Sequence, residues 1–161
     1  GAAGVVAEQT INAPGVNFAA QNYAVADYLY QQADTFVKPK YLVTAQPLSD
    51  IEAPEVSTTF ARLIPEQIGI RLSQLGYRMD LTSVTTTQDT NYLKPTLAPG
   101  EKPRFILTGN YLRKSNEVEV KTRIIDLQDN RIIAAFDYPI KMTREVREVL
   151  KSKPKIMRVE Q

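Results

Sequence analysis

Three polar residues in the last third of the chain are the first candidates for chemistry. Asp126, Asp129 and Asn130 lie close together between two apolar runs. A calcium loop places oxygen ligands at alternating positions, with a glycine at its tight turn and a glutamate further on. This segment has neither, whereas Asp and Asn are typical of tight turns because they tolerate positive φ and bond their own backbone. We therefore predict a hairpin turn here and no metal site.

Two other groups of acids need the same test. Asp50, Glu52 and Glu55 lie in the proline-containing stretch 46–55, which reads as a solvated connection. Asp80 and Asp137 both lie in predicted strands and would form a glycosidase-like pair only if they faced one cleft. A hydrolase using only carboxylates would need two buried acids with opposed pKa shifts. Nothing else in the sequence supports such a site, so we predict no catalytic residue.

The composition removes whole classes of enzyme. The chain has no His and no Cys, which excludes Ser-His-Asp and Cys-His catalysis and zinc sites built on those ligands. Its seven glycines are scattered, so neither a P-loop nor a dinucleotide fingerprint is present. We therefore expect a protein that is not an enzyme and that uses no cofactor or metal.

The charge is unevenly distributed along the chain. Residues 1–100 carry 6 basic and 9 acidic side chains, whereas residues 101–161 carry 14 and 9. This asymmetry indicates an anionic neighbour for the C-terminal part, such as lipid headgroups or an acidic protein. It is far below the basic patch expected of a nucleic-acid-binding protein.

Two sets of side chains are candidates for an interaction surface. Tyr23 and Tyr28 belong to a predicted helix, where their spacing keeps them off the core stripe that Tyr30 joins. Arg144, Arg147 and Lys151 recur at steps of three and four, so they share one face of the last predicted helix. The predicted interaction surface therefore consists of Tyr23, Tyr28, Arg144, Arg147 and Lys151.

The apolar periodicity predicts three helices. The first covers 18–37, with Val25, Leu29, Ala33 and Phe36 on its buried stripe, and ends before Pro39. The second covers 60–75, with a kink or restart at Pro65 and Gly76 as its left-handed C′ residue. A short third helix covers 143–151.

Five strands are expected, at 41–46, 77–82, 104–112, 117–126 and 131–140, with a long loop over 85–103. Strand–helix–strand with short joints predicts a parallel crossover. The last three strands read as an antiparallel meander, in which 104–112 is central and 117–126 has one wet face. The fold class is mixed α/β (α+β): one mixed sheet from a βαβ unit plus the meander, with helices packed on it. We expect a flexible tether at 1–15, a single domain at 16–151 and a basic tail at 152–161.

Three segments together resemble a known family. They are FARLIPEQIGIRLSQLGYRMDL (60–81), FILTGNYL (105–112) and VEVKTRIIDLQDNRIIAAFDYPI (118–140). Their order and spacing are similar to those of the FlgO family, flagellum-associated outer-membrane lipoproteins, over roughly 17–140.

The resemblance implies a periplasmic protein of a Gram-negative bacterium, anchored to the outer membrane by a lipidated Cys that would precede Gly1. It also implies a domain similar to the periplasmic domain of curli secretion channels, and a non-catalytic role in flagellar assembly or motility. The expected partners are other envelope or flagellar proteins, or a second copy of the chain, and no nucleic acid. Two alternatives stay open. One is a periplasmic module that binds a glycan or an acidic ligand in a concave pocket lined by Tyr and Arg. The other is an envelope assembly factor unrelated to flagella.

Overall fold

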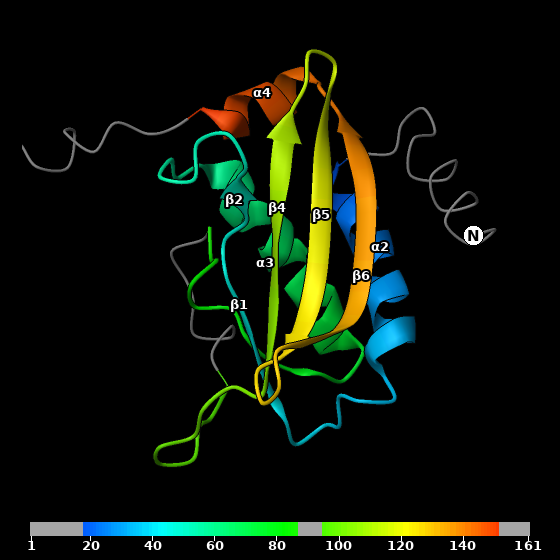
Figure 1. The fold of residues 1–161 in the computed structure, drawn as a ribbon, viewed down its shortest axis with the longest axis vertical. Coiled ribbons are helices and arrows are strands. Elements are labelled where there is room, and N and C mark those ends of the chain that lie inside the picture. Colours follow the sequence, from blue (N-terminus) through cyan, green and yellow to red (C-terminus); the bar gives the residue numbers. More distant parts are fainter. Residues whose placement is uncertain (1–17, 87–94, 152–161) are drawn as a thin grey trace, which may run out of the picture.

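The structure is a computed structural model that describes residues 18–86 and 95–151. The predicted tether at 1–15 and basic tail at 152–161 lie outside the described residues. The described part holds three helices and one mixed six-stranded sheet (Figure 1). The predicted mixed α/β fold is confirmed.

Helix α2 spans Phe18–Ala33 and buries the predicted stripe of Val25, Leu29 and Ala33. It ends four residues earlier than predicted, since 34–36 form a turn in which the Phe36 and Val37 amides both donate to the Ala33 carbonyl. Phe36 therefore leaves the helical stripe and is exposed, so its predicted place in the core is wrong. Buried Val37 takes over that end of the core.

Helix α3 spans Thr59–Gln74 and begins at Thr58, whose hydroxyl accepts the Ala61 amide. Gly76 has φ +108°, as predicted for a C′ glycine. The helix does not restart at Pro65, because it runs through this residue without interruption. Proline has no amide to offer the carbonyl four residues earlier, and that carbonyl, of Ala61, accepts the Leu48 amide instead at 2.8 Å.

The sheet has the order β3-β1-β4-β5-β6. Strands β1 (Leu42–Ala45) and β3 (Arg78–Asp80) pair in parallel, which confirms the predicted parallel crossover through α3. Strands β4 (Phe105–Arg113), β5 (Glu117–Asp126) and β6 (Arg131–Lys141) form the predicted antiparallel meander. Strand β4 is central, since β1 and the short β2 (Ser49–Asp50) pair with its other side.

The two long helices lie on one side of the sheet, behind the meander in the view of Figure 1. Val118, Val120, Thr122 and Ile124 of β5 are buried on that side, while the residues between them face away. A strand with one buried and one wet face alternates in this way. The far face of the meander is therefore open, as the sequence predicted for 117–126.

The ends of the meander are closed by two small elements. At one end, α4 (Arg144–Leu150) packs on α3 through buried Val146 and Leu150, beside the β4–β5 hairpin (Figure 1). At the other end, Asn130 has φ 59° and the Asp129 carboxylate accepts the Arg131 amide. The predicted hairpin turn at 126–130 is confirmed.

Candidate interaction surface

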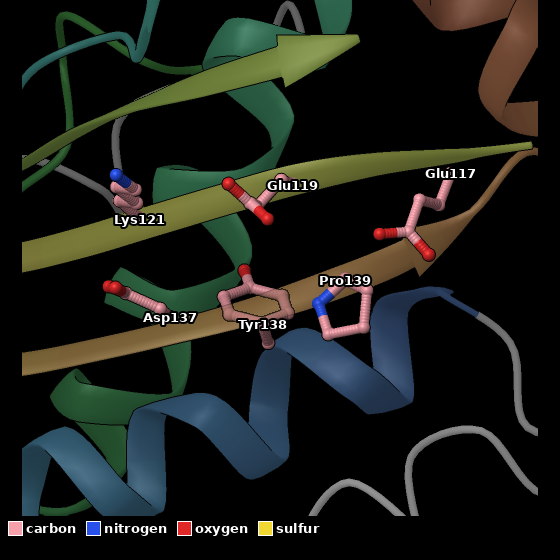
Figure 2. A pocket seen from close by; sticks show the side chains of 6 residues that line it. All are labelled: Glu117, Glu119, Lys121, Asp137, Tyr138 and Pro139. Carbon is pink, nitrogen blue, oxygen red and sulfur yellow. The ribbon is translucent and has the colours of Figure 1, made fainter. Parts of the chain in front are cut away.

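A shallow hollow marks the open face of the meander. It has a volume of about 510 Å³ and is lined by Glu117, Glu119, Lys121, Asp137, Tyr138 and Pro139 (Figure 2). Most of these residues are charged because they occupy the water-facing positions of β5 and β6. The register places Lys121 opposite Asp137 and Glu119 opposite Pro139, so residues from both strands meet there.

Two of the three carboxylates in the hollow are already paired. Lys114 Nζ lies 3.2 Å from Glu119 Oε2, and the Arg123 guanidinium lies 2.6 Å from Asp137 Oδ1. Asp137, an acid near the end of an apolar run, is thus the partner of Arg123 on the neighbouring strand. A hollow with three carboxylates around one lysine does not favour an acidic ligand, and it is not the pocket lined by Tyr and Arg that the binding-module alternative requires.

Tyr138 forms the back of the hollow and belongs to the core. Its hydroxyl donates to Asn22 Oδ1 at 2.9 Å, and Asn22 Nδ2 donates to Gln67 Oε1 at 2.7 Å. Burial raises the pKa of Tyr138, which keeps the phenol neutral. The side chain therefore joins β6 to both long helices and is not available as an acid or base at the surface.

The two strand aspartates do not form a catalytic pair. Asp80 lies on β3 and Asp137 on β6, the two outer strands of the main sheet path. Four strand-to-strand steps separate them, or about 19 Å at the usual spacing. Paired glycosidase carboxylates lie at most about 9.5 Å apart, so the glycosidase-like arrangement is excluded for these two residues.

Asp126 has a structural role at the end of β5. Arg104 holds it with two bonds, Nε to Oδ1 at 2.9 Å and a terminal nitrogen to Oδ2 at 3.1 Å, and Oδ1 also accepts the Gln128 amide. This guanidinium lowers the pKa of the Asp126 carboxyl. The pair closes the start of β4 against the end of β5. Within 18–86 and 95–151, no group of three or more potential ligands could hold a metal ion.

Asp50 is not part of a solvated loop, and this expectation was wrong. It is buried in β2, where its carboxylate accepts from the Glu52 and Ala53 amides and lies 3.2 Å from Arg113. The stretch 46–55 follows β4 closely enough for Ser49 and Asp50 to pair with it. Glu52 and Glu55 are exposed, as expected.

The predicted loop at 85–103 is held to the sheet where the structure describes it. Arg78 of β3 pairs with Glu101, with one bond at 2.7 Å, and also donates to the Thr96 carbonyl. Hydrogen bonding to Arg78 lowers the pKa of Glu101 to about 2. Residues 87–94 of the predicted loop lie outside the described part. At its start, the buried Glu66 carboxylate accepts both the amide and the hydroxyl of Thr86.

These contacts do not support a hydrolase built on carboxylates. Among the described residues, the carboxyls with a resolved shift are Glu101 and Asp126, and both have a lowered pKa caused by an arginine. A site that uses only carboxylates needs one acid with a raised pKa and another whose pKa stays low.

The helices of the described ranges are too short or too polar to cross a bilayer.

The five predicted interaction residues lie on two separate helices. Tyr23 is exposed on α2, whereas Tyr28 stacks on Phe136 of β6 with ring centroids 5.0 Å apart. Most of the Tyr28 ring is thus committed to the fold. Arg144 and Arg147 are exposed on α4, and Lys151, the residue that follows the helix, is also exposed and lies 3.0 Å from Glu148. Helix α4 packs on α3, and α2 packs on both α3 and β6.

Sequence reasoning missed the role of glutamine on α2. Gln32 makes two bonds to the backbone of Ala135, and Gln21 donates to the Pro139 carbonyl at 2.6 Å. These bonds run along the free edge of β6, where unpaired backbone groups would otherwise invite another strand. Pro139 has no amide to expose. A glutamine pair eleven residues apart has no recognisable sequence signal, because its function depends on the strand beside it.

Several solved structures are similar to this chain at low identity. The C-terminal domain of LpoB from Escherichia coli is 8% identical, with 75% of this chain and 98% of that chain covered and a TM-score of 0.46. The same domain from Salmonella enterica is 11% identical, with 73% of this chain and 95% of that chain covered and a TM-score of 0.45. Lipoprotein GNA1162 from Neisseria meningitidis is 10% identical, with 73% of this chain and 88% of that chain covered and a TM-score of 0.38. Scores and identities this low support no inference about function.

Family comparison is more decisive. No curated protein matches the chain. The model of the FlgO family, described as FlgO protein, matches residues 23–145, which include most of α2, all of α3, the whole sheet and the first residues of α4. The match includes the three segments whose order and spacing carried the resemblance. The chain therefore belongs to the FlgO family.

Proposed function

We propose that this protein is a non-enzymatic component of the bacterial cell envelope that acts by protein–protein contact in flagellar assembly or motility. The family match over residues 23–145 carries the proposal. In this role the protein is periplasmic and held at the outer membrane of a Gram-negative bacterium by a lipid anchor. Its partners are other envelope or flagellar proteins.

The arrangement of charge supports a scaffold more than a catalyst. The buried carboxylates Asp50 and Asp126 are held by arginines, and Glu66 is held by Thr86. Carboxylates engaged in this way fix strands and loops in place. Their oxygens already accept hydrogen bonds from the fold, which favours a structural role.

The exposed face of α4 is the first contact surface to test. Buried Val146 and Leu150 fix the helix on the fold, and Thr143 caps it by accepting the Val146 amide. This leaves Arg144 and Arg147 exposed on a rigid support. Arginine suits protein contacts because its planar guanidinium can bond a carboxylate through two nitrogens.

Deletion and complementation in the source bacterium test the proposal. We expect the protein in the outer-membrane fraction, and we expect the deletion strain to lose motility. Complementation with R144E/R147E should restore motility poorly, whereas K102E, a charge reversal at another exposed residue, should restore it fully. Normal motility in the deletion strain would leave an envelope role unrelated to flagella, and a cytoplasmic protein would overturn the envelope proposal.

A further inference from the structure

The open face of the meander carries its charges in two blocks. Along β5, the residues that alternate with the buried ones point away from the helices; they are Glu117, Glu119, Lys121, Arg123 and Ile125. The first two are acidic and the next two are basic, and Figure 2 shows Glu117, Glu119 and Lys121 in this order along the strand. The middle strand of the meander therefore presents an acidic half and a basic half to solvent.

Contacts within the chain use only part of this charge. Glu119 and Arg123 each have an ion-pair partner, yet Glu119 keeps 38% of its side chain exposed. Glu117 and Lys121 form no ion pair with any residue that the structure describes. Like charges also remain neighbours, since alternate residues of a strand lie only about 7 Å apart. A surface with the opposite order of charges would be attracted to this strand.

A second copy of the chain has that order when its β5 runs in the opposite direction. With two open faces together and a two-fold axis at Val120, Glu119 lies over Lys121 of the second copy, and Glu117 lies over its Arg123. Symmetry repeats both contacts. Sheets packed face to face lie about 10 Å apart, a distance that an acidic and a basic side chain span together. If the two β5 strands ran parallel, each charge would instead face its own copy, so the charges select the antiparallel dimer.

The strands on either side of β5 fit the same arrangement. On β6, the charged residues of this face are Asp137 and Lys141. The antiparallel dimer places Asp137 over Pro139 of the second copy and Lys141 over its Ala135, so no like charges meet. Strand β4 has only uncharged side chains on this face, at 106, 108, 110 and 112. The hollow, with three carboxylates around it, takes the lysine that the second copy brings over Glu119.

We propose that two copies of the chain form a dimer through the open face of the meander, with their β5 strands antiparallel. Three strands about 4.8 Å apart and about 34 Å long give a contact of roughly 500 Å² on each copy, against about 800 Å² in a standard interface. The dimer is therefore weak, and salt dissociates it because its contacts are ionic. It needs neither a lipid anchor nor an envelope partner, so its failure would leave the proposed function untouched.

Sedimentation equilibrium of the 161-residue chain, from micromolar to millimolar concentration, tests the dimer through charge reversals. Glu119 and Lys121 lie next to the axis, where rotating one sheet by about 30° against the other displaces them least. E119K and K121E should each weaken dimerisation about tenfold or more, since symmetry turns two attractive pairs into repulsive ones. In an equimolar mixture of the two variants, each new charge faces an opposite charge on the other chain. The mixture should therefore dimerise as the wild type does.

Two control variants separate this contact from others. Glu148 of α4 pairs with a lysine at 3.0 Å, much as Glu119 does at 3.2 Å, so E148K makes the same change outside the open face and should leave the dimer intact. Ile132 lies at one end of the open face and is 56% exposed, and I132S should also have no effect. A chain that stays monomeric, or a mixture that dimerises no better than E119K alone, would overturn the proposal. Loss of the dimer in either control would refute it too, by placing the contact elsewhere.

Discussion

Replacing Gln32 with alanine tests whether α2 seals the free edge of β6. In the wild type, the Ala135 amide donates to Gln32 Oε1 at 2.9 Å, and Gln32 Nε2 donates to the Ala135 carbonyl at 3.0 Å. Each bond contributes about 1 kcal/mol net, or about 2 kcal/mol for the pair. Gln32 is exposed, so water replaces part of this, and the freed side chain regains entropy. We expect a loss of about 1 kcal/mol in the free energy of unfolding.

Hydrogen exchange of the Ala135 amide reports on that bond alone. Q32A should make this amide exchange much faster, while the β5-paired amides of Ala134 and Phe136 stay protected. Q32E retains an oxygen that accepts the amide but loses the donor to the carbonyl, so protection at Ala135 should remain although stability falls. Urea unfolding measures the free energy in parallel.

The same helix offers a matched control for Q32A. Gln31 is exposed beside Gln32, so Q31A makes the same chemical change and should alter neither stability nor exchange at Ala135. Because an unsealed edge can pair with another chain, Q32A should also sediment with more self-association than Q31A. Unchanged exchange at Ala135 in Q32A would show that the glutamine does not hold this edge.

Two further changes test other parts of the fold. G109A should cost about 2 kcal/mol or more in urea unfolding, because a Cβ there would lie 2.0 Å from the backbone oxygen of Lys121 and one strand would have to move; a near-neutral G109A would contradict this packing. The pKa of Glu101 falls from 4.5 to about 2 on folding, so its pairing with Arg78 stabilises the protein above pH 4.5, and that contribution is lost as the pH falls towards 2. Thermal unfolding of wild type and E101Q should therefore differ most at neutral pH and converge in acid, and a constant difference would refute the linkage.

Local sequence patterns predicted most of the elements because their causes are local. The alternation in 117–126 follows from one wet and one buried face, and that pattern survives in β5. The turn at Asn130 follows from its tolerance of positive φ, and Gly76 ends α3 for the same reason. Expectations failed where a distant segment decides the outcome. Asp50 is buried because β4 and Arg113 lie beside it, and α3 continues through Pro65 because Leu48 satisfies the Ala61 carbonyl.

The candidate surfaces divide in the same way. The exposed basic face of α4 follows from helical spacing, so Arg144, Arg147 and Lys151 could be selected without a structure. Tyr28 could not be judged in that way, because the ring that covers it belongs to Phe136 on β6. The hollow combines residues of β5 and β6 whose meeting depends on strand register.

The sequence by itself determined the order of elements, the absence of histidine and cysteine chemistry, and the family to which the chain belongs. These properties depend on residue types and on spacings within single segments. Only the tertiary structure decided which acids are neutralised and how the edge of β6 is sealed. Each of these depends on pairs of residues far apart in the chain, and such pairs are brought into contact only by the packing of the helices on the sheet.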